Sequence, residues 1–410
     1  MKKYLPMFIV SFVIIYLSGC ANPVSVSNPP DISLTSQEKQ LVSSTEIFGF
    51  KLFKQVNQTA EDSNIFISPL SVSTALGMTL NGANGKTYDE MKSTLELTGA
   101  NQDDINKAYH SLNQMLTQID PKVIFESANS IWYRQGVTFE KSFLDVNKDY
   151  FDATVQGLDF SNPSSAGIIN DWVNEKTNGK IPSIIDHIPT EAVMYLINAI
   201  YFKGTWLYKF DSAATKQDDF YVTQNNPVKC MMMSQKDKFD YYQSSGYQAI
   251  ELPYGNGDFS MLVILPSGGT NINSFINQID ESFWDNLINN MDSSEVNLWL
   301  PKFKLEYNIE LSKTLEDMGM SSAFDPFQAD FSKLRPQKDI DISRVLHKAY
   351  IKVDEEGTEA AAATAVEMSL TAVIGPSPIY MKVNHPFLFA IRENNSGAIL
   401  FIGKVIDPVQ

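Results

Sequence analysis

The spacing of apolar residues predicts regular structure along most of the chain, beginning near Ser36. Leu41, Thr45, Phe48 and Leu52 recur at intervals of three and four residues, which is the period of one face of a helix about 20 residues long. The helical period also predicts helices at residues 69–80, 87–95, 103–118, 141–150, 164–177, 272–279, 281–289 and 311–318. Alternating or short apolar runs predict strands at residues 123–133, 192–202, 247–252, 259–265, 295–307, 349–354, 381–384, 387–392 and 398–405.

These helices and strands follow one another without the steady alternation that parallel sheets require. The pattern therefore predicts an α+β fold with mainly antiparallel sheets. No internal repeat and no long linker divides residues 37–410, and 43% of the chain is apolar, which is enough for one large core. We expect a single domain over this range.

The N-terminus has the features of a secretion signal. Lys2 and Lys3 precede an apolar run over residues 5–17, which is shorter than the about 20 residues that a membrane-spanning helix needs. The run ends in Leu17-Ser18-Gly19-Cys20, which resembles the lipobox of bacterial lipoproteins. We expect residues 1–19 to be removed as a signal peptide, and a plain secretion signal with an incidental cysteine is the alternative.

The lipobox resemblance implies that the thiol of Cys20 carries lipid. Residues 20–36 are rich in Ser, Pro and Asn without any helical or strand period, so they are expected to form a flexible tether between lipid and domain. The protein is then exported and anchored to the cell envelope, at the outer membrane, the cell surface or the periplasmic face. Cys230 remains the other cysteine, so no internal disulfide is expected, and its apolar neighbours indicate a buried position.

Charge excludes several classes of partner. Without residues 1–19 the chain has 30 basic and 48 acidic side chains, a net charge of −18, and no basic cluster offsets it. Nucleic acids and activating polyanions are therefore not expected to bind.

Enzyme signatures are absent from the sequence. The four histidines form no HExxH pair, and no GxSxG elbow, phosphate-binding GxxxxGK[ST] loop or GxGxxG fingerprint occurs. A triad of Ser, His and Asp brought together only by folding remains an open alternative, because triads are defined by geometry. We expect no enzyme activity, no bound metal and no cofactor.

Residues 355–375 carry the most informative pattern, EEGTEAAAATAVEMSLTAVIG. Read with the period of a strand, every charge after Glu356 falls on one face, and the other face is small at its start and apolar at its end. That face carries Thr358, Ala360, Ala362, Thr364, Val366, Met368 and Leu370. No proline interrupts the segment before Pro376, and Gly357 provides backbone freedom at its start. The pattern predicts a hinge followed by a strand that can be added to a sheet.

This segment resembles the hinge of the serpins, the serine protease inhibitor family, and other motifs agree in the same order along the chain. These motifs are Asn64-Ile65-Phe66-Ile67-Ser68-Pro69-Leu70-Ser71, Asn198-Ala199-Ile200-Tyr201-Phe202-Lys203-Gly204-Thr205-Trp206, Leu252-Pro253-Tyr254, Leu300-Pro301-Lys302-Phe303, His347-Lys348-Ala349, His385-Pro386-Phe387-Leu388-Phe389 and Phe401-Ile402-Gly403-Lys404-Val405. The resemblance covers about residues 40–408 and identifies the chain as a lipoprotein member of the family from a bacterium.

The resemblance implies a single domain of about eight or nine helices around three mainly antiparallel sheets, with an exposed reactive loop near residues 355–380. It implies hinge roles for Glu355, Glu356, Gly357, Thr358, Glu359, Ala360, Ala361 and Ala362. It implies control of sheet opening by Ser68, Ser71, Asn198, Trp206 and His347.

The implied function is suicide inhibition of endopeptidases by a monomer, in which the cleaved loop is inserted into the central sheet. The usual family spacing places the bait bond at Thr371–Ala372, with Leu370–Thr371 as the runner-up. Elastase-like, chymotrypsin-like or subtilisin-like targets are expected, and the resemblance does not decide whether cysteine endopeptidases are trapped as well. A non-inhibitory serpin that serves as a binding or structural protein on the cell surface is the alternative.

Overall fold

The computed structural model describes residues 33–358 and 378–409. The helices are α1 Ser36–Thr59, α2 Pro69–Leu80, α3 Gly85–Thr94, α4 Gln102–Gln118, α5 Lys141–Phe151, α6 Ser165–Lys176, α7 Ile272–Ile276, α8 Glu281–Asn289, α9 Ser312–Leu315 and α10 Ser321–Phe324. The strands are β1 Ile65–Ile67, β2 Val123–Arg134, β3 Thr154–Leu158, β4 Met194–Thr205, β5 Lys216–Thr223, β6 Asn226–Gln243, β7 Tyr247–Tyr254, β8 Phe259–Pro266, β9 Asp292–Pro301, β10 Phe303–Glu310, β11 Leu346–Asp354, β12 Gly357–Thr358, β13 Ile379–Lys382, β14 Phe387–Glu393 and β15 Ile399–Val405. The α+β prediction is confirmed.

Helix α1 begins where the apolar period predicted it, at Ser36. The Thr35 side chain accepts a hydrogen bond from the Glu38 backbone N–H, and the Glu38 carboxylate accepts one from the Thr35 backbone N–H. This reciprocal capping pairs backbone donors that a helix start otherwise leaves unpaired. None of the helices within the described ranges is long and apolar enough to cross a membrane.

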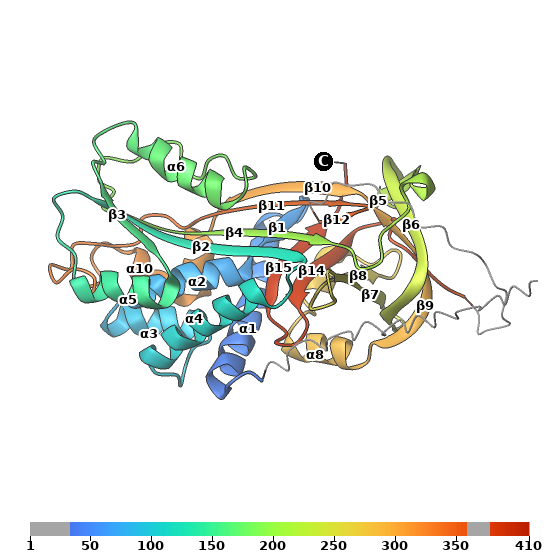
Figure 1. Ribbon diagram of the computed structural model, residues 1–410, viewed down its shortest axis with the longest axis horizontal. Coiled ribbons are helices and arrows are strands. Elements are labelled where there is room, and N and C mark those ends of the chain that lie inside the picture. The colour runs from blue at the N-terminus through green and yellow to red at the C-terminus, as the bar shows by residue number, and fades with distance from the viewer. Residues whose placement is uncertain (1–32, 359–377, 410) are drawn as a thin grey trace, which may run out of the picture. The chain divides into compact units, whose positions relative to one another are not determined.

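A six-stranded sheet in the order β10-β11-β12-β4-β2-β3 carries the hinge segment. Helix α6 covers one face through an apolar cluster that includes Trp132, Ile169 and Ile197. Helices α2 and α4 lie on the opposite face (Figure 1). Alternate residues of β4 and β11 therefore contact different layers, and residues two apart share one environment.

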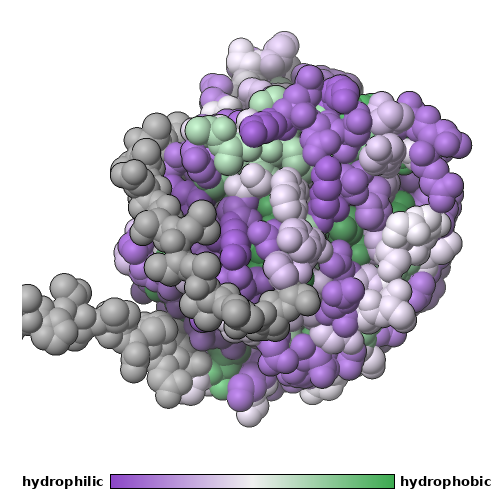
Figure 2. All heavy atoms as spheres, turned by 90° about the vertical axis from the view of Figure 1, so that its right-hand side faces the viewer, coloured by the Kyte–Doolittle hydropathy of each residue, from purple (hydrophilic) through white to green (hydrophobic). Residues whose placement is uncertain are grey.

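The other strands form one nine-stranded sheet, in which β5 pairs with β6 beside the path β1-β15-β14-β8-β7-β6-β9-β13. Among the described strands there are thus two continuous sheets where three were expected. The 18-residue strand β6 explains the difference, because it pairs with β9 through Met232–Tyr241 and with β7 through Asp240–Gln243. The end of the molecule that β5, β6 and β9 form is mainly hydrophilic wherever its atoms are coloured (Figure 2).

The single strand predicted at residues 295–307 was wrong. The chain passes from one sheet to the other at Lys302, whose backbone N–H donates to the carbonyl of Met231. Pro301 has no N–H for a further ladder bond, which favours a break at this position. The hairpin of β5 and β6 was missed, because its many Lys, Asp and Gln residues obscure the apolar alternation.

Candidate functional site: the hinge and the strands that flank it

The predicted hinge forms a short strand between two longer ones. After β11 ends at Asp354, a turn leads into β12, where Thr358 lies opposite Val353 of β11 and Gly204 of β4. Both pairings are antiparallel. Among the described strands, β4 and β11 each pair with β12 and not with each other. The first two residues of the insertable segment therefore already belong to the sheet.

Gly357 is required by a close backbone approach. A Cβ atom at this position would lie 2.1 Å from the carbonyl oxygen of Gly204 and 2.8 Å from the Cα atom of Thr205. The φ angle of Gly357 is +147°, a region that residues with side chains rarely adopt. A glycine at this position lets β12 pack against β4. The close contact alone requires glycine, whether or not the hinge also needs backbone flexibility.

Thr358 is buried, with 2% of its surface exposed. Its hydroxyl lies 2.6 Å from the hydroxyl of Tyr254, at the end of β7 in the other sheet. The Tyr254 ring stacks on Trp206, with ring centroids 4.4 Å apart and planes inclined by 12°. Trp206 holds the turn as well, because its indole N–H donates to the carbonyl of Asp354 and its backbone N–H to that of Glu356, both over 2.9 Å.

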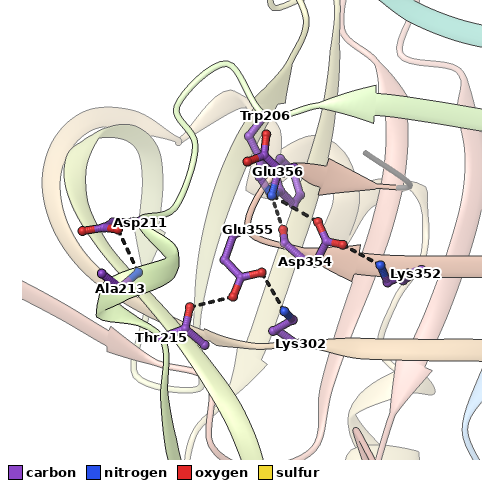
Figure 3. Close-up of polar contacts among 9 residues, drawn as sticks. All are labelled: Trp206, Asp211, Ala213, Thr215, Lys302, Lys352, Asp354, Glu355 and Glu356. Carbon is purple, nitrogen blue, oxygen red and sulfur yellow. Dashed lines mark hydrogen bonds and ion pairs between the residues drawn. The ribbon is translucent and has the colours of Figure 1, made fainter. Parts of the chain in front are cut away.

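Two ion pairs hold the acidic turn before the hinge. The Glu355 carboxylate accepts from Lys302 Nζ over 2.7 Å and from the Thr215 hydroxyl over 2.8 Å (Figure 3). Glu356 pairs with Lys209 Nζ over 2.6 Å. Burial alone would raise the pKa of Glu355, but the hydrogen bonds from Lys302 and Thr215 outweigh it and lower the pKa below 4.5. Glu355 is thus a charged anchor at neutral pH.

A polar cluster lies farther along the same pair of strands. The backbone N–H of Ser68, at the start of α2, donates to His347 Nε2 over 3.1 Å. The Ser71 hydroxyl donates to Asn198 Oδ1, and the Asn198 amide donates to Asn129 Oδ1 over 2.7 Å. These bonds connect α2 to β4 and β11, the two strands that flank the hinge.

His347 is buried and neutral. Burial lowers its pKa from 6.5 to about 4. The geometry agrees, because Nε2 accepts a backbone hydrogen bond and a protonated ring would direct an N–H at the N–H of Ser68.

A cavity of about 360 Å³ lies between β4 and β11 at their ends remote from the hinge. Met194, Leu196 and Asn198 line it from β4, and His347 lines it from β11. Helix α2 forms its floor through side chains that include Ser71. The two strands are thus separated where a further strand would lie.

The structure brings Glu355, Glu356, Gly357, Thr358 and Trp206 together at one end of β4 and β11. It places Ser68, Ser71, Asn198 and His347 in the second cluster, beneath the sheet. The other predicted site residues lie outside the described residues: Cys20, Glu359, Ala360, Ala361, Ala362, Leu370, Thr371 and Ala372.

Sequence reasoning missed four residues of the hinge site, Tyr254, Lys302, Thr215 and Lys209. Tyr254 and Lys302 belong to the family-like motifs Leu252-Pro253-Tyr254 and Leu300-Pro301-Lys302-Phe303. These motifs point to the two residues without indicating a role at the hinge. Nothing in the sequence relates Lys209 to Glu356, because folding brings them together across 147 positions.

The family model described as "Serpin (serine protease inhibitor)" matches residues 43–408. A serpin-like protein of Thermococcus kodakarensis, described as uncharacterised, is 33% identical over 428 residues, with 98% of each chain covered. The leukocyte elastase inhibitor of Sus scrofa is 34% identical over 382 residues, covering 90% of this chain and 100% of that protein. The crystal structure of the thermophilic serpin tengpin in its native state matches with a TM-score of 0.82 and 34% identity, covering 92% of this chain and 96% of that one.

The buried His347 predicts a loss of stability in mild acid. The unfolded chain binds a proton below pH 6.5 and the native state only near pH 4, so stability falls as the pH drops through this interval. We expect a fall of about 2 kcal/mol between pH 7 and pH 5 from this group. In urea titrations, the free energy of unfolding of His347→Gln should not show this fall between pH 7 and pH 5. His110→Gln, on a partly exposed histidine, should keep it, and equal pH slopes for the wild type and His347→Gln would contradict the assignment.

The two ion pairs predict unequal effects of neutralising the two glutamates. Glu355 is the less exposed and has two partners, so Glu355→Gln should lower the free energy of unfolding by about 1–2 kcal/mol. Glu356→Gln, at a more exposed carboxylate that pairs with Lys209, should cost less than about 1 kcal/mol. The Glu355 contribution is present above pH 4.5 and disappears as the pH falls below that value. Denaturant titrations at pH 7 and pH 3.5 measure both, and an equal cost at pH 7 would refute the ranking.

Proposed function

Because the chain belongs to the serpin family, we propose that it is a suicide inhibitor of serine endopeptidases and not an enzyme. The observation that carries the proposal is the position of β12, which begins a strand between β4 and β11 before any cleavage. Within the described residues β4 and β11 do not pair with each other beyond β12, so their facing edges can accept the residues that follow.

The register of β12 supports the insertion of the following residues. Continued in the same antiparallel register, each second residue after Thr358 would lie between one residue of β11 and one of β4, on the face that points into the core. Extended in this register through β11 to the residue before it, the apolar pairs would be Ile351 with Phe202, Ala349 with Ile200, and Val345 with Leu196. Ala360, Ala362 and Val366 would face these pairs in turn, and their small size suits a narrow gap.

The polar position of the segment supports the same register. In the continued pairing Thr364 would lie between His347 and Asn198, the polar pair on the path. A threonine hydroxyl can bond to either side chain there, so a buried polar residue would meet buried polar partners. A shift by one residue would instead bring the charged face of the segment to the core.

The proposed mechanism begins when a target protease attacks the loop as a substrate. The nucleophile of the protease adds to the carbonyl of Thr371, the bond to Ala372 breaks, and an ester joins protease and inhibitor. The freed segment then inserts with the ester attached. Fourteen inserted residues span about 46 Å, so the protease is carried away from the site where it bound. Distortion of its active site leaves the ester unhydrolysed, and the inhibitor is consumed.

The target is proposed to be an elastase-like, chymotrypsin-like or subtilisin-like enzyme. No Lys or Arg stands between Glu355 and Tyr380, so a trypsin-like protease has no basic residue to bind. The relative named as a leukocyte elastase inhibitor supports the first class. With Leu370–Thr371 as the alternative bait, a larger apolar pocket would be favoured.

Thr358→Arg tests the insertion mechanism. Wild-type protein mixed with an elastase or a subtilisin should give a covalent complex on denaturing gels. Thr358→Arg should give cleaved inhibitor without complex, because an unpaired arginine at this buried position costs several kcal/mol and removes the paired start between β4 and β11 from which insertion proceeds. The bait is about 13 positions away, so cleavage itself should persist.

Glu359→Arg is the matched control, because the period of two places position 359 on the opposite face of the inserted strand. It should form nearly normal amounts of complex. If Glu359→Arg and Thr358→Arg behave alike, the insertion register is wrong. If wild-type protein forms no complex with any protease of the three classes, a non-inhibitory binding or structural role replaces the proposal.

We propose further that the inhibitor is anchored to the cell envelope through lipid on Cys20. Cys20→Ala should abolish lipid labelling and processing before position 20, and the protein should leave the membrane fraction. Metabolic labelling with a fatty acid and cell fractionation measure this directly. A Cys20→Ala protein that is still processed there and sediments with membranes would show that something other than this lipid anchors it.

A further inference from the structure

Tyr254 joins the hinge to the second sheet. Its backbone belongs to β7 of the nine-stranded sheet, whereas its hydroxyl lies 2.6 Å from the Thr358 hydroxyl in the six-stranded sheet. We propose that Tyr254 is a positioning residue that keeps the first pair of hinge residues inserted before cleavage, so that strand addition starts from an existing nucleus. This inference rests on the proposed inhibitory function and adds a named group to it.

The ring of Tyr254 cannot turn its hydroxyl elsewhere. It stacks on Trp206 and meets Phe202 edge to face, with ring centroids 5.2 Å apart. A Cβ atom at Gly204 would lie 2.8 Å from the Tyr254 ring, so the ring lies directly against the backbone of β4. The side chain is fully buried and confined on these sides.

The hydroxyl of Tyr254 depends on the hinge for its hydrogen bond. Within the described residues it bonds to Thr358 and to no other group. If the hinge withdrew from the sheet, the Tyr254 hydroxyl would remain buried without a partner, which is unfavourable. The contact thus penalises withdrawal of Thr358 and holds β12 in place.

A preformed start matters because insertion competes with hydrolysis of the ester. Adding a strand is slowest at its first pairing, since the chain must be ordered before later contacts repay the cost. With Gly357 and Thr358 already paired, each following residue joins next to one that is in place. Removal of the Tyr254 hydroxyl should therefore slow insertion and divert more inhibitor to simple cleavage.

A double-mutant cycle tests the contact. Tyr254→Phe keeps the ring and removes the hydroxyl, and Thr358→Val keeps the shape and removes its partner. Each single variant should raise the ratio of inhibitor cleaved without trapping to inhibitor trapped by about fivefold, the factor that corresponds to one neutral hydrogen bond. The double variant should be no worse than the worse single one, and Thr358→Ser, which retains a hydroxyl, should remain near wild type. Tyr247→Phe, at the other end of β7, is the control for loss of a hydroxyl.

A second measurement needs no protease. Hydrogen exchange of the Gly357 and Thr358 amides in the intact protein should become faster in Tyr254→Phe and stay unchanged in Tyr247→Phe. Additive effects in the cycle together with unchanged amide exchange would overturn the positioning role, even if the wild type traps proteases. Faster exchange in Tyr254→Phe would support the positioning role of Tyr254. If exchange is faster but the wild type traps no protease, the positioning role stands and only the proposed inhibitory function fails.

Discussion

The antiparallel pairing of two residues, Gly357 and Thr358, between β4 and β11 is the constraint on which the rest of the site depends. It would fix the register of any strand added after it, because each added residue could pair only with the next positions of the flanking strands. It explains why position 357 is a glycine, since any side chain would collide with β4. It also determines which face of the segment points into the core.

The same arrangement leaves backbone hydrogen bonds that β4 and β11 could still form with an added strand. Below β12 the facing edges of β4 and β11 are not paired with each other, and a cavity of about 360 Å³ lies between their ends remote from the hinge. Within the described residues these facing edges have no ladder partner beyond β12, which is unfavourable, so an added strand would lower the free energy of the chain. The ion pairs of Glu355 and Glu356 and the hydrogen bonds from α2 to Asn198 and His347 act at the two ends of this opening.

Much of this could be predicted from the sequence, and the limits have physical causes. The α+β class and the positions of most helices and strands follow from local apolar periods, and so does the inward direction of Thr358. Long-range contacts carry no local signal, which is why Lys209 and Tyr254 were not assigned to the hinge. The strand predicted through Lys302 failed for a related reason, since apolar alternation continues across a point where the backbone changes sheets.

The two clusters at the ends of the opening differ in the kind of interaction that holds them, and this difference has a consequence for how they respond to acid. The hinge end depends on a carboxylate whose pKa is lowered by Lys302, so it loses its anchor only below pH 4.5. The other end depends on a buried, neutral His347. Keeping this ring neutral costs free energy relative to the unfolded chain once the pH falls below 6.5. Mild acid therefore weakens the polar cluster beneath the sheet while the hinge remains anchored, and the strands are expected to loosen first at the end remote from β12.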